Sequence, residues 1–172
     1  MRERFLRIAL SLLPIPFLAW GLSAHAQPVQ ESTLNYKGGT FSFVSNKSLS
    51  TLNSAVEEAV IVVHGSERNV DTYYHSINGL SKREGKSDQV LVIAPHYKVP
   101  RDSHKENEFS WSDEGWLRGD VSKNGSKVSS FEIIDAFITL LSKESIFPNL
   151  KKITLTGHSA GGQLTQRYAL AN

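Results

Sequence analysis

Residues 151–162 read Lys-Lys-Ile-Thr-Leu-Thr-Gly-His-Ser-Ala-Gly-Gly. The first six of these residues predict a short strand, and a helix is expected to follow as far as residue 171. At the junction, Gly157, Ser159 and Gly161 form the pattern G-x-S-x-G. A serine on a sharp strand-to-helix turn projects its hydroxyl from the sheet edge, and such a turn admits only small residues two positions before and after it. Ser159 is therefore a candidate nucleophile; the plainer alternative is a glycine-rich turn with an incidental serine.

Two continuous apolar runs lie upstream of this turn, at residues 59–63 and 90–94. Strands that are apolar on both faces belong in the interior of a parallel sheet. A helix is expected between them, capped by Asn69 and ended by Gly85, and a second helix follows a capping box at residues 129–132. Strands that alternate with helices predict an α/β domain with a mostly parallel sheet and helices on both faces.

The remaining patterns add detail to this domain. Residues 34–36 and 40–44 alternate apolar and polar around Gly38-Gly39, which predicts a β-hairpin. Each of the two helices is expected to bury one apolar stripe. In the first helix the stripe is Tyr73, Ile77 and Leu80; in the second it is Phe131, Ile134, Ile138 and Leu141, widened by Ile133, Phe137 and Leu140.

Polar residues follow the carboxyl ends of the three expected strands: His64, His96 and Ser159. In parallel sheets these ends meet at one edge, where active sites are built. In His64-Gly65-Ser66, Gly65 lets the backbone approach a substrate, and the backbone N–H groups of Ser66 and Ala160 would form an oxyanion hole. A plain turn at the strand end is the alternative for residues 64–66.

These features together resemble the α/β-hydrolase superfamily of serine esterases and related acyl hydrolases. The run that ends at His64-Gly65, the strand at residues 90–94 and the turn at residues 157–161 carry the resemblance, which covers residues 40–172. It implies hydrolysis of an ester or related acyl bond through an acyl-Ser159 intermediate, without a cofactor. It also implies an eight-stranded, mostly parallel sheet and a triad whose acid and histidine follow the serine in the chain.

The sequence departs from that pattern after the candidate nucleophile. Residues 160–172 contain no Asp, Glu or His. We therefore expect residues 27–172 to be a partial α/β-hydrolase domain, truncated after the helix that follows Ser159, with little or no turnover. Its outer strand would present an unpaired edge to another chain. The alternatives are a small protein whose triad is assembled otherwise, and a non-catalytic secreted binding protein or remnant.

The other candidate residues are interpreted mainly as structural. His158, inside the turn, is expected to pack into the fold, and His64 to order the loop that it precedes. His75 lies on the first helix, and His104 lies in a charged, solvated loop at residues 101–108. No metal is expected, although His64, His96 and Asp113 would be conceivable ligands. The two tryptophans of the long loop at residues 96–128, Trp111 and Trp116, either line a substrate pocket or are simply buried.

The N-terminus predicts export. Three arginines precede an apolar run that is interrupted by Pro14 and Pro16, and an Ala-x-Ala pattern ends at Ala26, so residues 1–26 are predicted to be a signal peptide cleaved after Ala26. A membrane anchor is the alternative, but the run is short for a spanning helix. Three Arg and one Glu in this segment account for the net charge of +2, so the secreted or periplasmic remainder is neutral and gives no electrostatic support for a nucleic-acid partner. The absence of cysteine excludes disulfides and thiolate chemistry.

Overall fold

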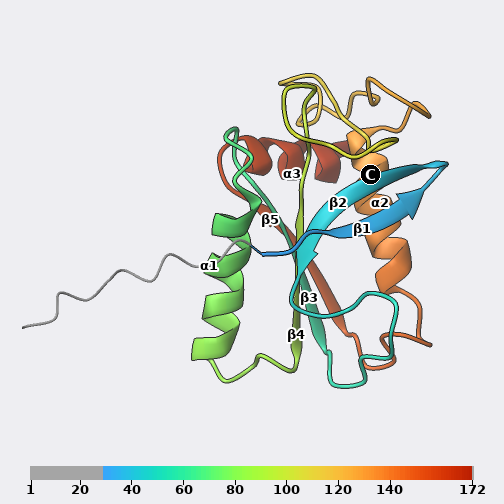
Figure 1. Ribbon diagram of the computed structural model, residues 1–172. Helices are drawn as coiled ribbons and strands as arrows, with labels where there is room; N and C mark the ends of the chain where they lie inside the picture. Colours follow the sequence, from blue (N-terminus) through green and yellow to red (C-terminus); the bar gives the residue numbers. More distant parts are fainter. Residues whose placement is uncertain (1–28, 172) are drawn as a thin grey trace, which may run out of the picture.

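A computed structural model describes residues 29–171; the predicted signal peptide lies outside these described residues. The chain forms an α/β fold with one sheet and helices on either side of it (Figure 1). In chain order the elements are β1 (Ser32–Tyr36), β2 (Gly39–Ser45), β3 (Glu58–Val63), α1 (Val70–Arg83), β4 (Val90–Pro95), α2 (Ser130–Leu141), β5 (Lys152–Gly157) and α3 (Ala160–Ala171).

The sheet is mixed, with strand order β1-β2-β4-β3-β5. β3 lies between β4 and β5 and pairs in parallel with both. The hairpin β1–β2 is antiparallel, and β2 also adds to β4 in antiparallel orientation. The expected parallel pairing holds for β3, β4 and β5. The sheet as a whole is mixed rather than mostly parallel, because the hairpin connection makes β1 and β2 antiparallel and β2 joins β4 in the opposite direction. Within the described part of the chain β5 is an edge strand, since β3 is its one paired neighbour.

Both faces of the central strands are buried, as their sequences predicted. Along β4, Leu91 and Ile93 belong to the core on one face, whereas Val90, Val92 and Ala94 belong to the core on the other. The first core receives α2 and α3, and the second receives α1. The predicted placement of helices on both faces of the sheet is thus confirmed, and the domain has three layers.

Local turn and cap signals were read correctly in three places. The β1–β2 turn places Lys37 and Gly38 at φ 42° and 77°, the left-handed geometry of a two-residue hairpin. α2 begins with the predicted capping box between Ser129 and Glu132. α1 ends in a Schellman motif at Gly85, whose φ is 67°; the N–H of Gly85 donates to Lys82 and that of Lys86 to Ser81.

Other details of the helices were wrong. Asn69 occupies the N-cap position of α1, but its side chain makes no capping hydrogen bond. Leu80, expected in the buried stripe of α1, is exposed. The residues buried along α1 are Val70, Tyr74, Asn78 and Ser81, and those buried along α2 are Ser130, Ile133, Ile134, Phe137 and Leu141.

The long loop between β4 and α2 covers the carboxyl edge of the sheet and contributes to the core. Trp111 and Trp116 are fully buried. Trp116 stacks on Tyr97 with ring centroids 5.6 Å apart, and the indole N–H of Trp111 donates to the Val128 carbonyl. The simple alternative of burial is therefore the one that the structure supports for both tryptophans.

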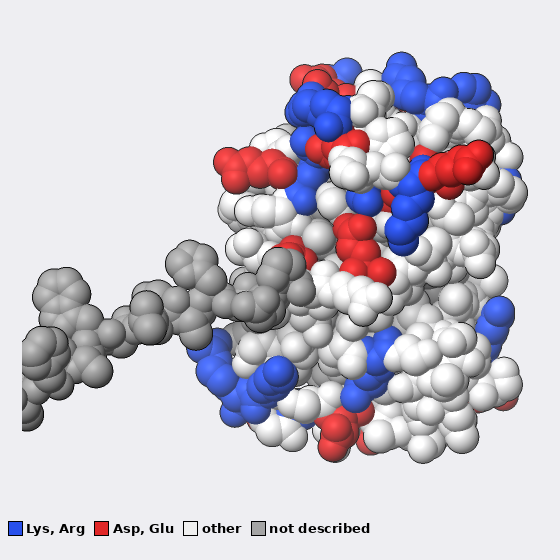
Figure 2. Space-filling model, in the orientation of Figure 1, with Lys and Arg blue, Asp and Glu red and all other residues white. Residues whose placement is uncertain are grey.

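None of the helices within residues 29–171 is both long enough and apolar enough to cross a membrane. Acidic and basic side chains are interspersed over the face seen in Figure 2.

Candidate functional site

The turn at Ser159 has the geometry of a strained strand-to-helix junction. β5 ends at Gly157 and α3 begins at Ala160, so that Ser159 lies between the two elements. Its φ is 54°, in the left-handed region that non-glycine residues seldom adopt. Such strain costs of the order of 1–3 kcal/mol and persists where the surrounding packing enforces it. Ser159 is exposed, so its side chain is open to solvent.

The two glycines of the pattern are required by contacts with backbone. A Cβ on Gly157 would lie 2.4 Å from the Gly161 carbonyl carbon. A Cβ on Gly161 would lie 2.3 Å from the Val63 carbonyl oxygen and 2.5 Å from that of His64. The turn therefore packs directly against the end of β3, which brings residues 64–66 beside it.

The proposed oxyanion donors lie on these two adjoining segments. Ser66 is exposed in the turn after β3, and Ala160 is the first residue of α3. Within residues 29–171, neither of their backbone N–H groups donates a hydrogen bond. Both are therefore available to a ligand, and the N-terminus of α3 adds a positive dipole end beside Ser159.

His64 is a buried, neutral residue with both ring nitrogens engaged. Nε2 accepts the backbone N–H of Tyr97 at 3.0 Å, so Nδ1 carries the proton and donates to the Gly65 carbonyl at 2.9 Å. Burial lowers the pKa of His64 to about 3. The imidazole therefore ties the loop after β3 to the segment that follows β4, and has no free nitrogen for proton transfer with Ser159.

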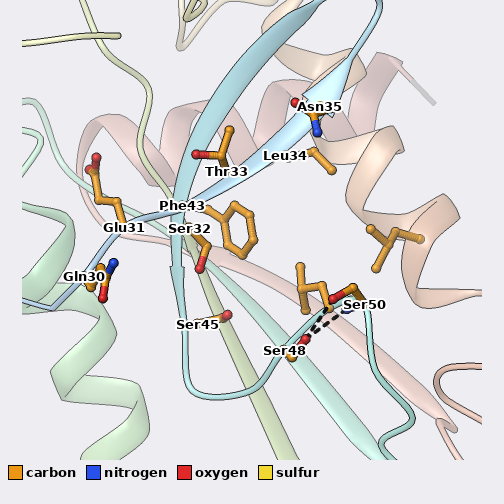
Figure 3. Close-up of a pocket in the computed structure, with 12 residues that line it drawn as sticks. Gln30, Glu31, Ser32, Thr33, Leu34, Asn35, Phe43, Ser45, Ser48 and Ser50 are labelled. Atoms are coloured by element: carbon orange, nitrogen blue, oxygen red, sulfur yellow. Dashed lines mark hydrogen bonds between the residues drawn. The ribbon is translucent and has the colours of Figure 1, made fainter.

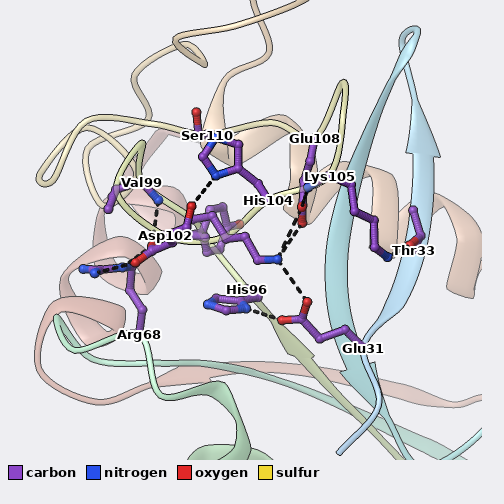
Figure 4. Close-up of polar contacts among 12 residues, drawn as sticks. Glu31, Thr33, Arg68, His96, Val99, Asp102, His104, Lys105, Glu108 and Ser110 are labelled. Atoms are coloured by element: carbon purple, nitrogen blue, oxygen red, sulfur yellow. Dashed lines mark hydrogen bonds and ion pairs between the residues drawn. The ribbon is translucent and has the colours of Figure 1, made fainter.

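His96 and Lys98 belong to an ionic network that was not predicted from the sequence (Figure 4). His96 pairs with Glu31, and Lys98 Nζ lies 3.0 Å from both Glu31 and Glu108. Burial by itself raises the pKa of Glu31, but the bonds from His96 and Lys98 outweigh it and lower this pKa to about 2. Glu108 is 1% exposed, so the loop at residues 101–108 is not simply solvated as expected.

A second missed contact joins the loop after β3 to the loop after β4. The Arg68 guanidinium binds Asp102 in a bidentate pair, with Nε–Oδ2 2.7 Å and Nη2–Oδ1 3.0 Å. Asp102 Oδ2 also accepts the Val99 N–H at 2.9 Å. Although burial raises it, the bonds from Arg68 and Val99 hold the pKa of Asp102 below its usual value. The sequence carries no local signal for this pair, whose members are 34 residues apart.

His158 does not pack into the fold as predicted. It is exposed, and its Nδ1 lies 3.4 Å from the Tyr73 hydroxyl. Among residues 29–171 the Ser159 hydroxyl has no hydrogen-bond partner. The described chain also contains no cluster of His, Asp or Glu able to hold a metal ion; the conceived ligand Asp113 instead pairs with Arg101 on the surface.

Of the surface hollows within residues 29–171, two bear on the candidate site. The larger, about 720 Å³, is lined mainly by β1 and by residues 45–50 (Figure 3). Neither the turn at Ser159 nor residues 64–66 contribute to it, so it is separate from the candidate site. A second hollow of about 560 Å³ is lined by the ionic network and by Arg68, which places it next to the loop after β3.

Comparison with known proteins gives a structural likeness only. No family model matches the sequence, and no curated protein matches it. Among solved structures the chain is similar to poly(aspartic acid) hydrolase-1 from Sphingomonas sp. KT-1, with a TM-score of 0.52 and 19% sequence identity. The match covers 81% of this chain and 50% of that chain, so this chain spans about half the length of its neighbour. At this identity the likeness concerns the fold.

Proposed function

We propose that this protein is a serine hydrolase of the α/β-hydrolase type, which cleaves an ester or related acyl bond through an acyl-Ser159 intermediate. The observation that carries the proposal is the left-handed φ of 54° at Ser159, enforced by two glycines that cannot accept a Cβ. The likeness in fold to a hydrolase of poly(aspartic acid) supports it.

In the proposed reaction Ser159 Oγ attacks the carbonyl carbon of the substrate, and the serine proton passes to solvent water, to which this exposed side chain is open. The carbonyl oxygen becomes an oxyanion that accepts hydrogen bonds from the N–H groups of Ser66 and Ala160, both without partners among residues 29–171. Collapse of the tetrahedral intermediate breaks the acyl bond, and the leaving group takes up a proton. Water then attacks the acyl-serine and releases the acid. No cofactor takes part.

No base contacts the Ser159 hydroxyl within residues 29–171, where this hydroxyl has no hydrogen-bond partner. His64 cannot take the proton, because both of its ring nitrogens are engaged. A serine that relies on its oxyanion hole alone still reacts, but orders of magnitude more slowly than one beside a base. We therefore propose slow acylation and little ester turnover for residues 27–172. The proposed substrates include small acyl esters. We further propose that the protein is exported and acts outside the cytoplasm.

A fluorophosphonate probe tests this function on the protein purified after export. We expect slow covalent labelling of the wild type, complete loss in Ser159→Ala, and retention in Ser66→Ala, because Ser66 is proposed to act through its backbone N–H. Labelling that survives in Ser159→Ala, or a folded wild type that does not react at all, would overturn the proposal.

A non-catalytic binding protein with the same fold is the second candidate. Two observations favour it: the Ser159 hydroxyl has no hydrogen-bond partner among residues 29–171, and His64 uses both of its ring nitrogens. Absence of labelling in a folded sample, together with binding of an acyl ester that is recovered intact, would select this alternative.

A further inference from the structure

Arg68 makes contact with both peptide groups that flank Ser66, the proposed oxyanion donor. Its backbone N–H donates to the Gly65 carbonyl at 3.1 Å. Its guanidinium Nη1 donates to the Ser66 carbonyl at 2.8 Å. One residue therefore holds the peptide plane on each side of Ser66.

The peptide between Gly65 and Ser66 determines where the oxyanion donor points. In a trans peptide the N–H of Ser66 points opposite to the carbonyl of Gly65. That carbonyl is fixed by two donors, Arg68 N–H and the buried imidazole of His64. The direction of the Ser66 N–H is thereby set before a substrate arrives, which is what electrostatic stabilisation of an oxyanion requires.

Arg68 is itself held under strain. Its φ is 56°, an uncommon conformation for a non-glycine residue, and its side chain is 11% exposed. The bidentate pair with Asp102 uses Nε and Nη2 (Figure 4). This leaves Nη1 for the Ser66 carbonyl. A lysine side chain ends in a single nitrogen. It therefore cannot reproduce the three contacts that the planar guanidinium makes through Nε, Nη1 and Nη2.

We infer that Arg68 is a positioning residue for the oxyanion hole, and that Asp102 holds Arg68 in place from the loop after β4. This inference rests on the proposed function and deepens it. Neither side chain touches the reacting atoms; both act through the backbone of residues 65–67.

The test compares Arg68→Lys and Asp102→Asn with wild type, using the rate of fluorophosphonate labelling at several probe concentrations. Matched controls are Arg101→Lys and Asp113→Asn, which alter an Arg–Asp pair of which each side chain is 61% exposed. We expect the maximal labelling rate to fall about tenfold or more in the two Arg68–Asp102 variants, equivalent to about 1.4 kcal/mol. The probe concentration for half-maximal rate and the final extent of labelling should stay unchanged, since a merely unfolded fraction would lower the extent instead.

Amide hydrogen exchange of residues 64–70 provides a readout that does not need reactivity. We expect faster exchange there in Arg68→Lys than in wild type and Arg101→Lys. Exchange in Arg68→Lys that equals the wild-type exchange would overturn the inference. So would a variant labelling rate equal to that of wild type, where wild type itself is labelled. A wild type that does not label overturns the proposed function instead, and the exchange result then decides whether Arg68 holds this loop.

Discussion

Gly161 lies against the end of β3 so closely that a Cβ would come within 2.3 Å of the Val63 carbonyl oxygen. This contact joins the turn that carries Ser159 to the segment that carries Ser66. Because the obstructing atoms belong to the backbone of β3, they cannot move aside as a side chain would.

Gly161→Ala should therefore destabilise the protein by about 1–3 kcal/mol, a cost typical of overpacking, and should abolish labelling of Ser159. The matched control is Gly79→Ala in α1, where a Cβ would meet nothing within 4 Å. That change should be neutral or stabilise by up to about 1 kcal/mol, as expected for alanine in a helix. Urea unfolding of the two variants checks this, and equal effects at both positions would contradict it.

His64 should make stability depend on pH. Its folded pKa of about 3 lies below the ordinary 6.5, so the unfolded chain binds a proton in this interval that the folded chain does not. The contribution of His64 to the free energy of unfolding is thus fully present above pH 6.5 and is lost as the pH falls toward 3. The free energy of unfolding should decrease by up to about 1.4 kcal/mol per pH unit below 6.5.

Urea unfolding at pH 7, 6 and 5 measures this dependence, with His64→Gln as the comparison. Glu31, whose folded pKa is about 2, contributes a loss only below its ordinary 4.5, outside this range. The variant is expected to be less stable at pH 7 because it loses the bonds to Tyr97 and Gly65, but its slope should be shallower. Parallel slopes in wild type and variant would refute the assignment.

The buried ion pair of Lys98 and Glu108 should be costly to break. Lys98 is 5% and Glu108 1% exposed, and Glu108 Oε2 also accepts the Lys105 N–H at 2.8 Å. Glu108→Gln leaves a buried ammonium with less compensation, for which we expect a loss of about 3 kcal/mol. Glu57→Gln, in an exposed pair with Lys151, should cost less than about 1 kcal/mol. Thermal or urea unfolding measures the loss of stability in both variants. Similar losses in Glu108→Gln and Glu57→Gln would contradict the prediction.

The predicted export signal can be checked independently of the fold. We predict that the secreted or periplasmic protein begins at Gln27, because the Ala-x-Ala pattern ends at Ala26. Intact mass and N-terminal sequencing of the exported protein measure this directly. A mature protein that keeps residues 1–26 and partitions with membranes would support the anchor instead.

Local signals in the sequence predicted much of this fold. The buried strands at residues 59–63 and 90–94, the capping box before α2 and the turn at Ser159 each depend on neighbouring residues, and each was found. The buried stripe of α1 was missed in part because it contains Asn78, which is buried through hydrogen bonds to Tyr74 and Asn46. A search for apolar periodicity passes over such a residue.

Contacts between distant segments could not be predicted in this way. Glu31 pairs with His96 across 65 residues, and Arg68 with Asp102 across 34. Both pairs depend on which loops the topology brings together at the carboxyl edge of the sheet. The antiparallel addition of β2 to β4 is equally a property of the assembled sheet, since nothing within either strand specifies the direction of its partner.

The position of the covalent adduct identifies the nucleophilic residue. After reaction with a fluorophosphonate, the purified protein is digested and its peptides are mapped by mass spectrometry. We expect a single adduct on Ser159 in wild type, and none in Ser159→Ala. An adduct on another residue, or an unmodified Ser159 in folded protein after prolonged exposure, would contradict the assignment of Ser159 as the nucleophile.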